Sequence, residues 1–268
     1  MAVAAVNIEA SNMSMPTKII LASVVVLTGL AILAIPQVRK SLSRFLSVTG
    51  PNAGDHADAR LPKINAALSA AKPGFIFLAG DSHAELLGEA TLCGLPVVNG
   101  GSHGANAKVY VSLLNALDFK ATPAAVVLLI GTNDIFVKNQ PAEPRNLAEK
   151  IARVDTIAKS LTKISPQLVM TPLPPIAPRT TRILDLTALV ALSQEQKWLC
   201  EQNPACQFVD PFRDMRDRVF GLARSGATAD GLHSSDYGKV RQALEAAICP
   251  PPIVTSGNAG APRPLKLR

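Results

Sequence analysis

The alternation of short apolar runs with longer amphipathic segments constrains the fold of this chain more than any other feature. The apolar runs predict strands at residues 75–79, 96–99, 124–130, 167–172 and 207–210. Segments with helical spacing of apolar residues follow them, at residues 84–90, 105–118, 146–164, 184–201 and 234–248. Parallel strands joined by right-handed helical crossovers carry helices on both faces of one sheet. The sequence therefore predicts a three-layer α/β/α sandwich around a five-stranded parallel sheet.

The first predicted strand delivers a serine to the edge of this sheet. Residues 75–79 carry no charge, and Gly80 permits backbone angles that a side chain would block, so the chain can turn sharply there. Ser82 then stands at the start of a helix, where unpaired N–H groups and the helix dipole favour developing negative charge. Ser82 is thus a candidate nucleophile, although this stretch taken alone favours a helix cap as the explanation of the serine.

Three further segments place polar residues and glycines where functional groups of a parallel sheet gather, outside the carboxyl ends of its strands. The second strand is followed by residues 99–106, which read Asn-Gly-Gly-Ser-His-Gly-Ala-Asn, and the third by residues 131–134, which read Gly-Thr-Asn-Asp. Asp230 precedes His233 by three residues, so in a tight turn its carboxylate can accept a hydrogen bond from the imidazole and fix its tautomer. Taken singly, each segment is also explained by turns and caps.

Taken together and in this order, the four segments resemble the blocks of the SGNH, or GDSL-type, hydrolase family. The resemblance covers residues 73–249 and implies a flavodoxin-like fold. The matching positions are Ser82 in the first block, Asn99, Gly101 and Gly104 in the second, Gly131 and Asn133 in the third, and Asp230 and His233 in the last. Ala105 and Asn106 depart from the residues that often follow the second block. This leaves the role of the Gly104 backbone N–H intact.

The resemblance implies a catalytic set and a reaction. Ser82 is the nucleophile, His233 the base and Asp230 the residue that orients it, while the oxyanion hole consists of the Ser82 and Gly104 N–H groups and the Asn133 amide. The expected activity is hydrolysis of carboxylic esters, of short acyl or acetyl groups, through an acyl-serine, with neither a metal nor an organic cofactor. His83 and His103 are expected to be polar residues at the rim of the site.

Two other functions stay open at this point. Gly-Asp-Ser-His-Ala, residues 80–84, is similar to the version in SGNH domains that work with membrane-bound O-acyltransferases on cell-envelope glycans. The chain could therefore be an O-acyltransferase that moves acyl groups onto such glycans, with a membrane acyltransferase as partner. The second alternative is a catalytically silent scaffold of the cell envelope.

The distribution of charge argues against a nucleic-acid partner. The chain has a formal net charge of +7, but residues 73–250 contain seventeen basic and seventeen acidic side chains. The excess lies in the flanks, residues 1–72 and 251–268. No basic stripe with interleaved aromatic residues occurs in the neutral central region, as a nucleic-acid-binding surface would require.

The N-terminal flank predicts a membrane anchor. Residues 19–35 run without a charge, and continuation to residue 38 gives a span long enough to cross a bilayer. A cleaved signal peptide and a buried core helix are the alternatives. The predicted organisation is a polar tail at residues 1–17, a single transmembrane helix at 18–38, a juxtamembrane connector at 39–72, the SGNH domain at 73–250 and a flexible Pro-rich basic tail at 251–268.

Signals for the side of the membrane oppose each other. Basic residues after the predicted span favour a cytoplasmic domain. The cysteines favour an oxidising compartment, because Cys200 and Cys206 could close a small disulfide loop and Cys93 and Cys249 make the total even, although four buried thiols explain them equally well. The resemblance to the SGNH family favours a single-pass membrane protein with an extracytoplasmic domain, since similar anchored members face the cell envelope. No Cys/His cluster with metal-ligand spacing occurs.

Overall fold

A computed structural model, which describes residues 52–88 and 90–249, confirms the five-stranded parallel sheet. The strands are β1 (Ile76–Gly80), β2 (Val97–Gly101), β3 (Ala125–Leu129), β4 (Leu168–Met170) and β5 (Cys206–Phe208). Their order is β2-β1-β3-β4-β5, and every neighbouring pair is parallel. After β1 the chain forms β2 on one side of it and then β3, β4 and β5 on the other side. The topological switch point therefore lies between β1 and β3.

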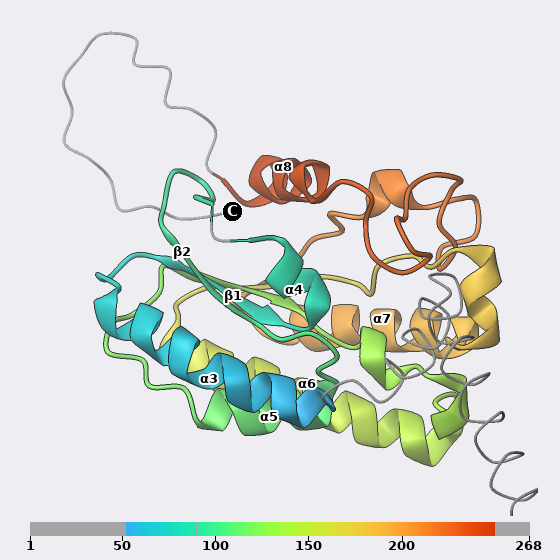
Figure 1. The fold of residues 1–268 in the computed structure, drawn as a ribbon, viewed down its shortest axis with the longest axis horizontal. Helices are drawn as coiled ribbons and strands as arrows, with labels where there is room; N and C mark the ends of the chain where they lie inside the picture. The colour runs from blue at the N-terminus through green and yellow to red at the C-terminus, as the bar shows by residue number, and fades with distance from the viewer. Residues whose placement is uncertain (1–51, 89, 250–268) are drawn as a thin grey trace, which may run out of the picture. The chain divides into compact units, whose positions relative to one another are not determined.

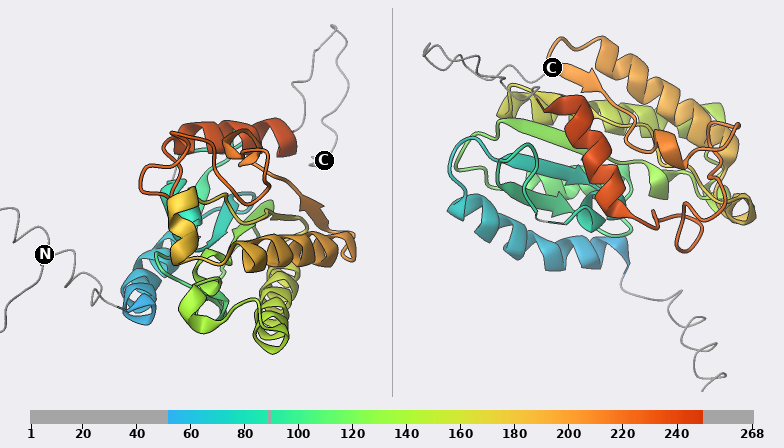
Figure 2. Two further views of the ribbon diagram at one scale, coloured as in Figure 1. Left: turned by 90° about the vertical axis from the view of Figure 1, so that its right-hand side faces the viewer. Right: turned by 90° about the horizontal axis from the view of Figure 1, so that it is seen from above.

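Helices cover both faces of the sheet (Figures 1 and 2). One face carries α3 (Ala53–Ala70), α5 (Ala107–Asn115), α6 (Pro144–Ile164) and α7 (Leu186–Glu201), and the other carries the short α4 (Ser82–Leu86) and α8 (Tyr237–Ile248). Successive residues of a strand point to opposite faces, so Phe77 and Val126 pack in the core under the first set, while Ile76 and Val127 pack under α4 and α8. This strand alternation produces the two cores of the α/β/α sandwich.

Helix α3 lies in the segment that the sequence assigns to a connector at residues 39–72. Asn52 caps its first turn by accepting hydrogen bonds from the Gly54 and Asp55 backbone N–H groups. Ile64 and Leu68 of α3 are buried in the main core. The compact part of the chain therefore begins N-terminal to the expected boundary at residue 73. The sequence shows only a modest helical pattern at residues 61–72, and Pro62 lies within the helix, so the signal for α3 as part of the core was weak.

Two disulfide bonds join the four cysteines. Cys200 is bonded to Cys206, which ties the end of α7 to the start of β5, and Cys93 is bonded to Cys249. The second bond connects the segment before β2 to the residue after α8, across 156 positions of sequence. The sequence allowed either disulfides or four buried thiols, and the structure contains the disulfides.

The predicted N-terminal tail, the span at residues 18–38 and the tail at 251–268 lie outside the described residues. Within residues 52–88 and 90–249, no helix combines the length and the apolar character that crossing a bilayer requires.

Candidate active site

Ser82 is held at the carboxyl end of β1, the central strand of the β2-β1-β3 group. Gly80 has φ +136°, and a Cβ at this position would collide with the Leu129 carbonyl of β3. Asp81 then caps α4, with its side chain accepting a 2.9 Å hydrogen bond from the His83 backbone N–H. Helix α4 therefore starts at Ser82, where the sequence predicted a helix start, although the apolar spacing begins only at residue 84. The serine lies in its first turn.

The structure brings Ser82, His233 and Asp230 into one hydrogen-bonded chain. His233 Nε2 lies 2.9 Å from Ser82 Oγ, and His233 Nδ1 lies 2.7 Å from Asp230 Oδ2. The other carboxylate oxygen of Asp230 accepts hydrogen bonds from the backbone N–H groups of Leu232 and His233. The three-residue spacing of Asp230 and His233 thus forms the tight turn that the sequence predicted.

The electrostatics of this turn keep Asp230 ionised. Partial burial raises the pKa of the Asp230 carboxyl, but the hydrogen bonds from the His233 ring and from the two backbone N–H groups outweigh burial and lower this pKa to about 2. An ionised carboxylate accepts a hydrogen bond from Nδ1, so the Nε2 lone pair of a neutral His233 faces the Ser82 hydroxyl. This is the tautomer that a general base requires.

A second loop holds the Asp230–His233 turn in place. Gly231, with φ +103°, lies between the two side chains, and its carbonyl accepts hydrogen bonds from the Ala177 N–H at 2.8 Å and the Thr180 hydroxyl at 3.0 Å. Thr180 belongs to the one-turn 3₁₀ helix Pro178–Arg182. The Pro-rich segment after β4 therefore supports the turn that positions His233.

Two backbone N–H groups and one side-chain amide are the predicted members of the oxyanion hole. Residues 102–105 form a turn closed by a hydrogen bond from the Ala105 N–H to the Ser102 carbonyl, and Gly104 has φ +73° within it. Asn133, in the 3₁₀ helix Thr132–Asp134 after β3, donates a 3.1 Å hydrogen bond from Nδ2 to the Ala105 carbonyl. Among the described residues, the N–H groups of Ser82 and Gly104 donate to no protein acceptor.

Comparison with known proteins identifies the fold. Among solved structures, a GDSL-like lipase from Bacteroides thetaiotaomicron matches with a TM-score of 0.54 and 18% identity, over 70% of this chain and 97% of that one. A protein provisionally described as a platelet activating factor, from Streptococcus pneumonia, matches with a TM-score of 0.61 and 21% identity, over 78% of this chain and 97% of that one. This chain has the SGNH hydrolase fold. No family sequence model matches it, and no curated protein matches it in sequence.

Within the SGNH fold the predicted site residues meet at one edge of the sheet. Ser82 follows β1, Gly104 follows β2 and Asn133 follows β3, which are neighbouring strands. Asp230 and His233 come from the loop before α8. The carboxyl ends of the strands and this loop therefore converge at the switch point, which is where open α/β sheets bind their ligands.

The expectation that His83 lies at the rim is wrong. His83 has no exposed surface, because α4 begins at Ser82 and turns the next side chain inward. Its Nδ1 lies 2.8 Å from the Tyr237 hydroxyl, and its ring centroid lies 5.2 Å from that of His233. Burial, together with the neighbouring His233, lowers the pKa of His83 to about 3, so the ring is neutral. His83 therefore packs against the ring of the base and lies away from the exposed rim of the site.

Sequence analysis assigned no task to Glu85 or to the Asn99 side chain. Asn99 Nδ2 donates to the carbonyls of Ala84 and Gly88, and Asn99 Oδ1 accepts from the Gly101 N–H. Glu85 Oε2 accepts from the His103 N–H at 2.7 Å. Both side chains fasten the turn after β2 to α4. Asn99 is a motif position of the second block, so the sequence marked the residue but not the bonds of its side chain. Nothing in the sequence indicated a role for Glu85.

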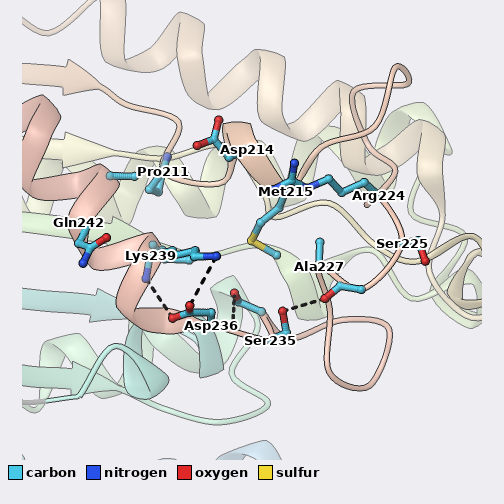
Figure 3. A pocket seen from close by; sticks show the side chains of 14 residues that line it. Pro211, Asp214, Met215, Arg224, Ser225, Ala227, Ser235, Asp236, Lys239 and Gln242 are labelled. Atoms are coloured by element: carbon cyan, nitrogen blue, oxygen red, sulfur yellow. Dashed lines mark hydrogen bonds and ion pairs between the residues drawn. The ribbon is translucent and has the colours of Figure 1, made fainter.

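A separate cavity of about 790 Å³ lies beside α8 (Figure 3). Met215 and Ala227 line it together with charged side chains of both signs, among them Asp214, Arg224 and Lys239. Its lining includes Ser234 but neither Ser82 nor His233. We assign this cavity no part in the chemistry.

Proposed function

We propose that this chain is a serine hydrolase of the SGNH family that cleaves carboxylic esters of short acyl groups. The observation that carries the proposal is the unbroken hydrogen-bonded chain from Ser82 Oγ through His233 to Asp230, with distances of 2.9 Å and 2.7 Å. A cap alone would explain Ser82, and a turn alone would explain Asp230. Neither explains why the imidazole of His233 contacts Ser82, which lies 151 positions away in the sequence.

The residues supply each step of ester cleavage. Ser82 Oγ attacks the ester carbonyl while His233 Nε2 takes the hydroxyl proton, and Asp230 stabilises the charged imidazole. The free N–H groups of Ser82 and Gly104, with the Asn133 amide, bind the oxygen that becomes negative in the tetrahedral intermediate. Protonated His233 gives its proton to the leaving alcohol, and water releases the acyl group from Ser82 by the same sequence of proton transfers.

The exposure of the site favours water as the acyl acceptor. The side chain of His233 is 23% exposed and that of Asp230 is 56% exposed, so solvent reaches the base. Transfer to a glycan hydroxyl requires that water be kept out of the acyl-serine stage. These exposures support a hydrolase over the O-acyltransferase, and with it a function that needs no acyltransferase partner.

The polar surroundings of the serine favour a small acyl group. The half-exposed ring of His103 lies 6.2 Å from that of His233, between centroids, and Glu85 accepts hydrogen bonds beside it. A long alkyl chain placed against these groups would remove them from water without replacing their hydrogen bonds. We therefore propose acetyl or similarly short esters as substrates.

The decisive experiment measures hydrolysis of p-nitrophenyl acetate by the full chain, with free acetate and acetylated envelope glycan quantified in parallel. We expect Ser82→Ala and His233→Ala each to abolish turnover with little change in Tm, and we expect Ser69→Ala, at an exposed serine on α3, to leave turnover unchanged. Activity retained by Ser82→Ala excludes the proposal. Serine-dependent transfer that outcompetes acetate release identifies the acyltransferase instead, and failure of Ser82 to react with a fluorophosphonate probe identifies the silent scaffold.

We also propose that the domain lies on the extracytoplasmic side of a membrane, anchored by residues 18–38. The two disulfides support this location, since cytosolic reductants keep thiols reduced and such bonds persist in oxidising compartments. A phosphatase reporter fused after Arg268 is expected to be active and to sediment with membranes. An inactive phosphatase fusion contradicts the extracytoplasmic location. A fusion that stays in the soluble fraction contradicts the membrane anchor.

A further inference from the structure

Three side chains capable of binding a metal ion converge beside the triad from separate parts of the chain. His56 comes from α3, Glu85 from α4 and His103 from the turn after β2. Their donor atoms, His56 Nε2, Glu85 Oε2 and His103 Nδ1, all lie within 4.8 Å of one another. Glu85 Oε2 is 3.1 Å from the His56 atom and 2.6 Å from the His103 atom.

We propose that His56, Glu85 and His103 form a binding site for a divalent transition-metal ion of the Zn²⁺ class. Two imidazole nitrogens and one carboxylate oxygen are a donor set that zinc sites use when a fourth position stays open to water. With metal–ligand bonds of about 2.0–2.1 Å, neighbouring donors of a tetrahedral site lie about 3.3 Å apart. The two spacings to Glu85 Oε2, 3.1 Å and 2.6 Å, are shorter than this value, and all donors lie within 4.8 Å of one another, so side-chain rotations that separate the donors make room for the ion.

The site is open to solvent and the fourth position can be filled from it. The side chains of His56, Glu85 and His103 are 32%, 19% and 43% exposed. An ion can therefore enter without any opening of the fold, and water can complete its coordination.

The cation Arg60 lies beside this cluster. Its Nε lies 3.7 Å from Glu85 Oε1, the carboxylate oxygen that does not face the histidines. The guanidinium also donates to the Asn99 and Gly101 carbonyls, which hold it in place. Arg60 thus forms an ion pair with Oε1, and Oε2 is the Glu85 oxygen that faces both histidines, so we expect Glu85 to bind the ion through Oε2.

A metal ion bound at this site would also restrain the turn that carries Gly104 of the candidate oxyanion hole. Glu85 Oε2 accepts the His103 N–H, and His103 precedes Gly104 in the turn. A bound ion would join α3, α4 and this turn through bonds stronger than the hydrogen bonds between them. Binding and stability report on the metal site without any ester turnover, so the inference stands or falls independently of the proposed hydrolase activity.

The test is titration of the full chain, freed of metal with a chelator, with ZnCl₂ in isothermal titration calorimetry. We expect one ion per chain and a rise in Tm on adding Zn²⁺. His56→Gln removes one of three protein ligands, and we expect it to weaken binding at least tenfold and abolish the rise in Tm. Asp58→Asn removes an exposed charge from the same helix without removing a ligand, and is expected to bind as the wild type does.

Two outcomes overturn the proposal. The first is absence of saturable binding at one ion per chain. The second is binding that His56→Gln leaves unchanged and His233→Ala removes, because the ion then lies on the triad. The Tm of His56→Gln in the absence of metal, equal to that of the metal-free wild type, shows that a loss of binding is not a loss of folding.

Discussion

Asn133 is the only side chain expected to contribute directly to the oxyanion hole, since the other two donors are backbone N–H groups. Its Nδ2 already donates one hydrogen to the Ala105 carbonyl, which aims the amide and leaves the second hydrogen for substrate. We predict that Asn133→Ala lowers kcat for ester hydrolysis by about 10²–10³-fold, with a small change in KM, because the lost interaction forms mainly in the transition state.

Steady-state kinetics of Asn133→Ala test this assignment. The matched control is Asn139→Ala, an exposed asparagine a few residues further on, for which we expect wild-type kcat and KM. If both variants kept the wild-type kcat, the amide would have no part in catalysis and the two backbone donors would suffice.

The disulfides differ in how much chain they enclose, and their contributions to stability should differ accordingly. Cys93–Cys249 spans 156 positions and Cys200–Cys206 spans six. In the chain-entropy view, closing the longer loop restricts the unfolded state more, by about 5 kcal/mol against about 2 kcal/mol. We predict that Cys93→Ser with Cys249→Ser lowers the free energy of unfolding more than Cys200→Ser with Cys206→Ser, as measured by urea denaturation. Equal losses would show that the entropy of the unfolded chain does not decide the effect.

Helix α3 offers a test of where the folded domain begins. Leu68 has no exposed surface and packs in the main core, whereas Lys63 on the same helix is exposed. We predict that Leu68→Ala lowers the free energy of unfolding by about 2–5 kcal/mol through the cavity that it leaves. Lys63→Ala is expected to change it little, also by urea denaturation. A connector that lies outside the folded domain would give the same small effect for both variants.

Buried carboxyls at the edge of the sheet make the stability of the whole molecule depend on pH. Burial raises the pKa of Asp134 to about 6, although its carboxylate accepts a hydrogen bond from the Ala107 N–H. Between the ordinary carboxyl pKa and this value the folded state holds a proton that the unfolded state has lost. The contribution of Asp134 to stability therefore falls as pH rises through this window.

Asp134→Asn removes this titration while keeping an oxygen that can accept from Ala107. We predict that the variant gains stability relative to the wild type as pH rises from 4 to 7, by about 1–3 kcal/mol. Denaturation at several pH values gives this difference directly. A difference that stays constant over the range would mean that the carboxyl ionises as easily in the folded protein as in the unfolded chain.

Much of the architecture was predictable because it depends on local patterns. Apolar runs and helical spacing placed all five strands to within a few residues, and the four blocks named Ser82, Asp230 and His233, which the structure brings together. The start of α4 was not predictable from apolar spacing, since the cap at Asp81, a polar residue, decides it. The burial of His83 was not predictable either, since its neighbours Tyr237 and His233 are distant in sequence.

The sequence by itself determined which elements form and which motif residues stand at their ends, because strand and helix periods and turn residues act over a few neighbouring positions. Only the tertiary structure decided that α3 belongs to the core, that the cysteines pair, and that Tyr237 meets His83. It also decided that His56, Glu85 and His103 share one cluster. Successive members of this cluster are separated by 18 or more positions. Their proximity arises from how the helices pack on the sheet, which no local sequence pattern determines.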